Sequence, residues 1–370
     1  MAAALSVFKY GGSSVGNANA IKAVCEHISK STERCIPVVS AMYGITDVLL
    51  CDTTKSEAKR EQVVEIHKAT ARELLEGNAY RAFETYLDIN IREALHLPLH
   101  HPVLASMGER LSSRLVAAHL NETGTASVHV EDVVITDKHG TPLLARSEPV
   151  CNAMLTSTIE DGKVPVVAGY YARSVDGQVT LLGRGGTDLT AAVVAHAMDA
   201  NKLVLWKVEC DKESEGGGTS FMKEWIPGYV GLVHQADPTH TIERVHYKHA
   251  SELAKLGKKV LHPDTVFPVI DKNIPIEIKN TLDPKQAGST IDGFTPISSQ
   301  VTVASKGDLI ALVGQQDVHE AVRCVNVLEE NRIEARLDAS YRESLAIRLR
   351  DETGSSSAVS ILHSMYHGRA

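Results

Sequence analysis

The sequence predicts an α/β fold built on a mainly parallel sheet, followed by a smaller C-terminal layer of strands and helices. Over the first two-thirds of the 370 residues, short apolar strands alternate with helical patterns, as is typical of parallel sheets whose strands are joined by helices. In the first such unit, an apolar strand that begins at Val7 meets Gly11 and Gly12 and then a helical pattern. The helix shows one apolar face with i, i+3, i+4 and i+7 spacing, formed by Ile21, Val24, Cys25 and Ile28.

Further elements of this α/β part follow from the same two periodicities. We expect helices within residues 56–97 and over 102–120 and 249–256, and strands over 36–40, 165–169, 179–182, 202–206 and 275–279. The segment 208–229 is charged, rich in glycine and without periodicity, so it predicts an extra exposed loop. Its aromatic residues, Phe221 and Trp225, could cover a ligand, contact a partner or fold back onto their own domain.

The C-terminal part has a different order of elements. A polar stretch around residues 293–299 predicts a boundary between a domain of residues 1–295 and one of residues 296–370. Beyond it we expect two strands, a helix, two strands and a helix, over residues 301–304, 309–313, 318–329, 333–337, 345–349 and 356–366. This order predicts a ferredoxin-like layer of about 70 residues, a size that can fold as a unit.

The composition excludes several classes of partner. The net charge of −8 and the lack of a Lys/Arg run argue against nucleic acid. The six cysteines are scattered without a C-x-x-C pair, which is typical of reduced thiols in a cytosol. No apolar run reaches the ~18–20 residues that span a bilayer, and the early first strand leaves no room for a signal peptide. We therefore expect a soluble, cytoplasmic protein with no membrane partner.

Two strand–glycine–helix turns carry the charged residues that point to chemistry. In the first, Lys9 precedes Gly11 and Gly12, and a lysine beside the backbone N–H groups of a helix start suits a phosphate. It is not the common phosphate loop, because G-x-x-x-x-G-K-[ST] does not occur in the sequence. In the second turn, Arg184 offers a planar fork for a carboxylate or phosphate. Asp188 could cap the helix, bind Mg²⁺ or hold a substrate ammonium group.

Five separated segments resemble, in the same order, the motifs of aspartate kinases within the amino-acid kinase family. They are Lys-Tyr-Gly-Gly-Ser-Ser-Val at residues 9–15, the strand and turn at 38–46, Gly-Glu at 108–109, the glycine turn at 182–192 and Leu-Gly-Lys-Lys-Val-Leu-His-Pro at 256–263. The resemblance implies a three-layer αβα sandwich followed by a C-terminal ferredoxin-like domain of the ACT type. It also implies transfer of phosphate from ATP, with Mg²⁺, to the side-chain carboxylate of L-aspartate. The product is 4-phospho-L-aspartate, on the way to lysine, threonine and methionine.

The resemblance also implies roles for individual residues. Lys9, Arg184 and Asp188 would be catalytic. The amino acid would be bound by Ser14, Ser40, Thr46, Glu109, Arg184, Thr187 and Asp188, with Arg184 on its carboxylate and Glu109 on its ammonium group. The nucleotide and its phosphates would be bound by Lys9, Gly11, Gly12, Ser13, Lys207, Gly231 and Lys259. Without the resemblance, Lys259 and its neighbouring lysines would be interpreted as a solvated helix end.

The chain departs from the family pattern in two places. After Trp206 the family usually has a Thr-Asp-Val-Asp-Gly turn, whereas this chain continues with Lys207 and an altered segment. Either Glu209 or Asp211 replaces the missing acid, or nucleotide binding is weakened. Aspartate kinases also usually carry two ACT domains, one inserted in the other, and the inserted one is missing here. We therefore expect a homodimer formed through one ACT-like domain, with weak or no inhibition by lysine or threonine.

Other interpretations remain open at this point. The enzyme could phosphorylate a different carboxylate, or the chain could be a degenerate kinase domain that acts as a regulatory subunit. Retention of Lys9, Arg184 and Asp188 argues against degeneracy. A zinc site is not expected, because the histidines follow no standard zinc spacing at positions 234, 240, 246 and 249.

Overall fold

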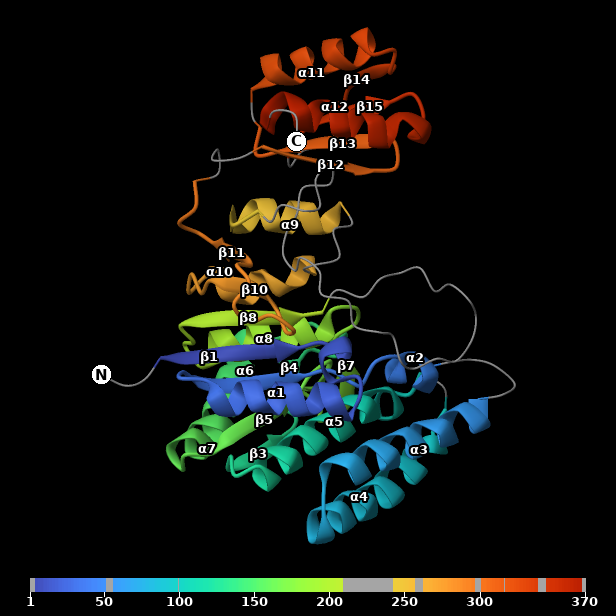
Figure 1. Cartoon of the computed structure of the whole chain (residues 1–370), viewed down its shortest axis with the longest axis vertical. Coiled ribbons are helices and arrows are strands. Elements are labelled where there is room, and N and C mark those ends of the chain that lie inside the picture. The colour runs from blue at the N-terminus through green and yellow to red at the C-terminus, as the bar shows by residue number, and fades with distance from the viewer. Residues whose placement is uncertain are drawn as a thin grey trace. The chain divides into compact units, whose positions relative to one another are not determined.

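The computed structural model describes residues 4–50, 56–98, 100–208, 242–256, 262–296, 301–315, 317–338 and 344–367 (Figure 1). The chain forms two compact units. One consists of Met1–Gly228 with Phe267–Pro284, and the other of Tyr229–Val266 with Lys285–Ala370. The predicted division into domains of residues 1–295 and 296–370 stays a prediction.

The first unit is built on a parallel sheet with the strand order β3-β5-β2-β1-β8-β10. The strands are β1 (Leu5–Tyr10), β2 (Arg34–Val39), β3 (Ser127–Val130), β5 (Val164–Ala168), β8 (Lys202–Lys207) and β10 (Ile276–Asn280). The central strands are almost wholly buried, because helices cover both faces of such a sheet. The expected parallel α/β fold is confirmed.

Helices connect these strands and form the two outer layers. They are α1 (Ala18–Lys30), α2 (Ile45–Leu49), α3 (Ser56–Leu74), α4 (Gly77–Leu95), α5 (Pro102–Glu122), α6 (Leu144–Cys151), α7 (Ser157–Glu160), α8 (Gly186–Ala197) and α10 (Phe267–Ile270). A 3₁₀ turn, η1 (Gly12–Val15), follows β1, and a π-helical turn, η2 (Asn152–Thr156), lies between α6 and α7. Figure 1 shows α3 and α4 side by side.

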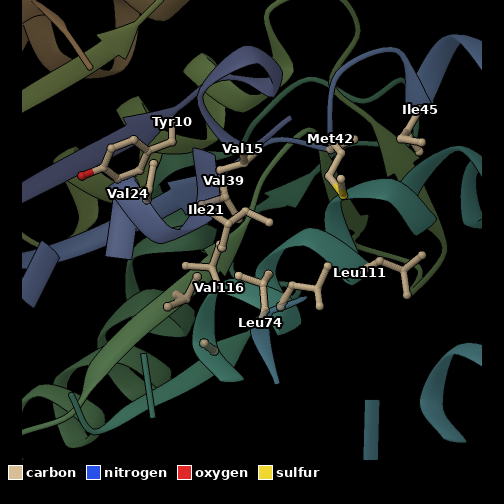
Figure 2. Packing of buried hydrophobic residues seen from close by; sticks show 14 of the residues in the cluster. Tyr10, Val15, Ile21, Val24, Val39, Met42, Ile45, Leu74, Leu111 and Val116 are labelled. Atoms are coloured by element: carbon tan, nitrogen blue, oxygen red, sulfur yellow. The ribbon is translucent and has the colours of Figure 1, made fainter. Parts of the chain in front are cut away.

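The core of the first unit lies between the sheet and the layer that contains α1 and α5. The four apolar residues predicted for the face of α1 are all buried, and Asn17 caps the helix by accepting the N–H of Ala20 at 2.9 Å. In Figure 2, Ile21 and Val24 of α1 lie close to Val39 of β2 and Val116 of α5. Tyr10 of β1 lies beside Val24, so α1 packs directly on the first strand.

A small second sheet supports the loops of the first unit. It contains β4 (Ile135–Thr136), β6 (Tyr171–Ser174) and β7 (Val179–Leu181) in the order β4-β6-β7. The antiparallel hairpin of β6 and β7 leads directly into the second glycine turn. The pairing of β6 with β7 therefore fixes where this turn begins.

The second unit contains the predicted ferredoxin-like layer. Its antiparallel sheet has the order β12-β13-β15-β14, and its core includes Val303, Ile310 and Ile347. The elements are β12 (Thr302–Lys306), β13 (Leu309–Val313), α11 (Val318–Glu330), β14 (Ala335–Leu337), β15 (Leu345–Leu349), η4 (Glu352–Gly354) and α12 (Ser355–His367). The same unit contains β9 (Arg244–His246), α9 (Tyr247–Lys255), η3 (Pro263–Thr265) and β11 (Ser289–Asp292), and β9 and β11 pair in parallel. None of the helices described is both long and apolar enough to span a membrane.

Candidate active site

The strand order places two of the predicted site residues, Lys9 and Lys207, at the carboxyl edge of the parallel sheet. From β1 the chain continues to β2 on one side, whereas β8 pairs with β1 on the other side. In open parallel sheets, ligands bind beyond the carboxyl ends of the strands where the order reverses in this way. Lys9 and Lys207 lie near the carboxyl ends of β1 and β8, one on each side of the reversal.

Asp188 lies between these two lysines. Its Oδ1 is 2.6 Å from Nζ of Lys9, and its Oδ2 is 3.0 Å from Nζ of Lys207. Burial alone would raise the pKa of Asp188, but the charges of Lys207 and Lys9 outweigh burial and hold this pKa well below its usual range. Burial also lowers the pKa of Lys9, although Asp188 counteracts this effect. In this group, Lys9 and Asp188 are buried and Lys207 is partly exposed, and the two lysines share one carboxylate.

Asp188 does not cap its helix. The N-cap of α8 is Gly185, and Asp188 lies inside the first turn. Gly183 and Gly185 both have a φ of +73°, a conformation that favours glycine. Arg184 between them is exposed and makes no hydrogen bond or ion pair to the described residues. The turn therefore presents a guanidinium group that is available to an anionic ligand.

Glu109 brings a buried carboxylate to the same edge. It lies on α5 and is 1 % exposed, and its Oε2 makes no hydrogen bond to the described residues. Burial raises the pKa of Glu109 to about 8, although a backbone hydrogen bond from Ala41 and the charge of Lys9 act in the opposite direction. A cationic group of a ligand would donate a hydrogen bond to Oε2 and favour the ionised form of Glu109.

Close backbone contacts bring Glu109 and the first glycine turn together. A Cβ on Gly108 would lie 2.6 Å from Cβ of Ala41, and one on Gly12 would lie 3.0 Å from the carbonyl oxygen of Ala41. Both positions therefore need glycine for the loop after β2 to pass between them. The turn itself is closed by the N–H of Ser14, which donates to the carbonyl oxygen of Gly11 at 2.9 Å.

The predicted hydroxyl groups form contacts between elements. Thr187 Oγ1 donates to Ser40 Oγ at 3.3 Å, so the start of α8 meets the end of β2. Ser14 is buried, and its Oγ is 3.0 Å from Oγ1 of Thr281, after β10. Thr46 lies half-buried in the first turn of α2.

The sequence did not point to Tyr170, which the structure places beside the second glycine turn. Its φ is +73°, which is strained for a bulky residue. Its N–H donates to Oγ1 of Thr190 at 3.1 Å, and its carbonyl oxygen accepts the N–H of Leu182 at 2.9 Å. A Cβ on Gly186 would lie 3.0 Å from Cδ2 of Tyr170. The signal that could have revealed this residue is the pair Gly169-Tyr170 directly after a buried strand.

The structure thus brings together Lys9, Asp188 and Lys207, pairs Ser40 with Thr187, and turns Glu109 toward the same edge. Arg184 stands apart on the exposed turn. Gly231 and Lys259 lie outside the described residues, as do the two acids Glu209 and Asp211. Their suggested roles stay predictions.

Known proteins similar to this chain are aspartate kinases. Aspartokinase 2 of Arabidopsis thaliana is 29% identical over 80% of this chain, and the chain covers 56% of that protein. The aspartokinase of Chlamydia muridarum is 28% identical over 77% of this chain, and the chain covers 63% of that protein. Lysine-sensitive aspartokinase 3 of Escherichia coli is 26% identical over 95% of this chain, and the chain covers 79% of that protein. The chain thus spans little more than half of the Arabidopsis protein.

Solved structures of aspartate kinases share the fold. The Clostridium acetobutylicum aspartate kinase superposes with a TM-score of 0.76 at 19% identity, with 98% of this chain and all of that chain covered. The complex of E. coli aspartokinase III with aspartate and ADP superposes with a TM-score of 0.68 at 22% identity, with 98% and 84% covered. Residues 4–208 match the model of the amino acid kinase family. These residues make up more than half of the chain and include Asp188 with its two lysines. The chain therefore belongs to the amino acid kinase family.

Proposed function

We propose that this chain transfers the γ-phosphate of ATP to the side-chain carboxylate of L-aspartate and produces 4-phospho-L-aspartate. The observation that carries the proposal is Asp188 held between Lys9 and Lys207 at the point where the strand order reverses. The similarity to proteins named aspartokinases supports aspartate as the acceptor. So does the fold shared with an enzyme whose complex contains aspartate and ADP.

The amino acid would be held by charges of both signs. The buried Oε2 of Glu109 suits the α-ammonium group, because a cation there relieves the desolvated carboxylate. The exposed Arg184 suits a carboxylate through two parallel N–H···O bonds. The hydroxyl groups of Ser40, Thr46 and Thr187 would complete the contacts.

Phosphoryl transfer would depend on position and charge neutralisation. A side-chain carboxylate oxygen of aspartate forms a bond to the γ-phosphorus while the bond from that phosphorus to the bridging oxygen breaks, and ADP leaves with the electron pair. No proton has to move, because the attacking oxygen is already ionised. Lys9 and Lys207 would neutralise the charge on the equatorial and bridging oxygens. Asp188 holds both ammonium groups in place.

The residues of this edge fit ATP with its magnesium ion. Within the described ranges, no group of three His, Cys, Asp or Glu side chains could hold a metal. Mg²⁺ is commonly bound mainly by substrate phosphates and water, so we infer that it enters with ATP. It would supply further neutralisation of the phosphate charge. The phosphates would lie against Gly11, Gly12 and Ser13 and beside Lys9.

The C-terminal layer would serve regulation and assembly. We propose that residues 1–295 form the catalytic domain and that residues 296–370 form one ACT-like domain that joins two copies of the chain. Val318 and Val322, one turn apart on α11, are exposed apolar side chains that favour such a contact. The molar mass in solution, measured by light scattering, tests the dimer.

The deciding experiment traps the acyl phosphate with hydroxylamine in the presence of ATP, Mg²⁺ and L-aspartate. We expect hydroxamate from the wild-type chain and at least 100-fold less, about 3 kcal/mol of barrier, from Lys9→Ala. The matched control is Lys30→Ala, since Lys30 is an exposed lysine paired with Glu26 on α1. Wild-type hydroxamate no higher than that of Lys9→Ala contradicts the kinase proposal. A higher rate with L-glutamate than with L-aspartate contradicts only the acceptor.

A further inference from the structure

A cluster of aromatic rings lies on the opposite face of the strands that carry the two lysines. Side chains alternate along a strand, so Lys9 faces Asp188 whereas Phe8 and Tyr10 face the core next to α1. Trp206 precedes Lys207 on β8 and is the register partner of Tyr10. The rings of Tyr10 and Trp206 are stacked, with centroids 6.4 Å apart. Each lysine is therefore one residue away from a buried aromatic ring.

His27 of α1 joins these rings. Its Nδ1 is 2.7 Å from the hydroxyl oxygen of Tyr10, and its ring centroid is 4.2 Å from that of Trp206. It also stacks on Phe8 at 5.7 Å. Within the described part of the chain, the buried Nε1 of Trp206 makes no hydrogen bond, so ring contacts hold this indole. His27 thus contacts three aromatic residues on the two strands.

We propose that His27 is a positioning residue for phosphoryl transfer, and that it acts through Tyr10 and Trp206 on the strand ends that carry Lys9 and Lys207. This inference rests on the proposed function. Each ring shares its strand with the adjacent lysine, Tyr10 with Lys9 and Trp206 with Lys207. A shift of either ring along its strand therefore moves that lysine relative to Asp188. The barrier is sensitive to such a shift, since misplacement of about 1 Å can cost 100-fold in rate.

The charge of His27 affects this arrangement. Burial and then the charge of Lys279 on β10 lower the pKa of His27 below 6.5. Its ring is therefore neutral near pH 7, and Nδ1 can accept a hydrogen bond from the hydroxyl group of Tyr10. Among the described residues, the rings that contact His27 are those of Phe8, Tyr10 and Trp206, all of them uncharged near pH 7. Burial raises the pKa of Tyr10. Protonation of His27 would remove the acceptor and place a cation among the rings.

Kinetic variants separate positioning from packing. His27→Leu and Tyr10→Phe each remove the hydrogen bond, and we expect each to lower kcat by about 3- to 10-fold, the effect of one neutral hydrogen bond on a barrier. The double variant is expected to be no slower than the slower single variant. The KM for aspartate should stay within about twofold, because Glu109 and Arg184 lie on other elements. His27→Asn retains a hydrogen-bond acceptor close to the position of Nδ1 and is expected to restore part of the rate.

The control is Ser29→Ala on the same helix. Ser29 Oγ is 2.7 Å from Thr125 Oγ1 in an exposed hydrogen bond, and its loss should leave kcat unchanged. A kcat within twofold of wild type for both His27→Leu and Tyr10→Phe overturns the inference.

A spectroscopic test needs neither turnover nor a variant of the cluster. Trp206 becomes the only tryptophan in Trp225→Phe, and a protonated imidazole 4.2 Å away quenches indole fluorescence. As the pH is lowered, we expect the fluorescence of Trp206 to fall, with a midpoint below pH 6.5. Saturating MgADP should move this midpoint upward, because phosphates bring negative charge to the other face of the same strands. A midpoint that MgADP does not move overturns the inference even if the His27 variants fail to fold. Absence of hydroxamate from the wild-type chain would instead contradict the proposed function.

Discussion

At the scale of single residues, the site is defined by buried charges that are satisfied to different degrees. Asp188 has a lysine on each carboxylate oxygen, whereas the Oε2 of Glu109 is buried without a hydrogen bond to the described residues. A buried, unpaired carboxylate costs several kcal/mol unless it is protonated or meets a cation. Glu109 is therefore the residue at which ligand binding and protonation compete most directly.

We expect Glu109→Gln to raise the KM for aspartate by about 10- to 100-fold, since it removes a charge-assisted hydrogen bond. In the wild-type chain, kcat/KM for aspartate should fall as the pH drops below about 8, the pKa of Glu109. The variant should lack this dependence. Initial rates from pH 6 to 9 at subsaturating aspartate, with Asp47→Asn as a nearby exposed control, check both points. An unchanged KM would contradict the assignment of Glu109.

Glu109→Gln should weaken the binding of aspartate but increase the stability of the folded chain at high pH. The pKa of Glu109 is about 8 in the folded chain, above the usual 4.5, so the native state binds a proton at this carboxyl group more tightly than the unfolded state does. Proton binding therefore stabilises the native state fully below pH 4.5, and this stabilisation is lost as the pH rises through 8. Glu109→Gln avoids the buried charge. We therefore expect a higher free energy of unfolding than wild type above pH 8, measured by urea denaturation, and a smaller difference at pH 5.

At the scale of elements, α5 is held in place by an ion network beside Glu109. Arg110, the next residue, pairs with Glu131 and lies 4.3 Å from the centroid of the Tyr171 ring. Arg114, one turn later, is 3.2 Å from the same carboxylate. Tyr171 follows the strained Tyr170, so one network anchors both α5 and the start of β6.

We expect Glu131→Gln to destabilise the chain by about 1–3 kcal/mol at pH 7, because two half-buried guanidinium groups lose the carboxylate that they share. Burial alone would raise the pKa of Glu131, but His129, Arg110 and Arg114 lower it to about 2. A lowered pKa gives stability that is present above pH 4.5 and is lost as the pH falls toward 2. The difference in the free energy of unfolding between Glu131→Gln and wild type, measured by urea denaturation, should therefore be smaller at pH 3 than at pH 7. Glu26→Gln, which breaks an exposed pair with Lys30, should have almost no effect.

At the scale of the whole molecule, the described residues 301–367 form one ferredoxin-like layer with one four-stranded sheet. The stretches of sequence between successive strands of this sheet are short, which supports the proposal of a single ACT-like domain. We expect millimolar lysine or threonine to leave the hydroxamate rate within about twofold of its uninhibited value, a change under ~0.5 kcal/mol. The lysine-sensitive aspartokinase 3 of E. coli is the positive control for this assay. Loss of turnover in lysine or threonine would contradict this expectation.

The sequence by itself determined most of the elements of this protein. The apolar face of α1, the buried strands β1, β2, β5 and β8, and the order of elements after residue 300 follow from local periodicity. Glycine turns beside Lys9 and Arg184 also marked the charged residues, because a strand, a glycine pair and a helix start are a local pattern.

Only the tertiary structure decided which of these residues meet. Lys9 and Asp188 are 179 positions apart, and their contact depends on β1 and β8 being neighbours and on α8 covering the face that Lys9 occupies. The pairing of Lys207 with Asp188 has no local signal, because the two side chains come from different elements, β8 and α8. The pKa of Glu109 likewise depends on burial by α5 and the loop after β2. The spacing of apolar residues predicts whether a segment forms a helix or a strand. The distance between two charged side chains depends instead on how these segments pack in the folded chain.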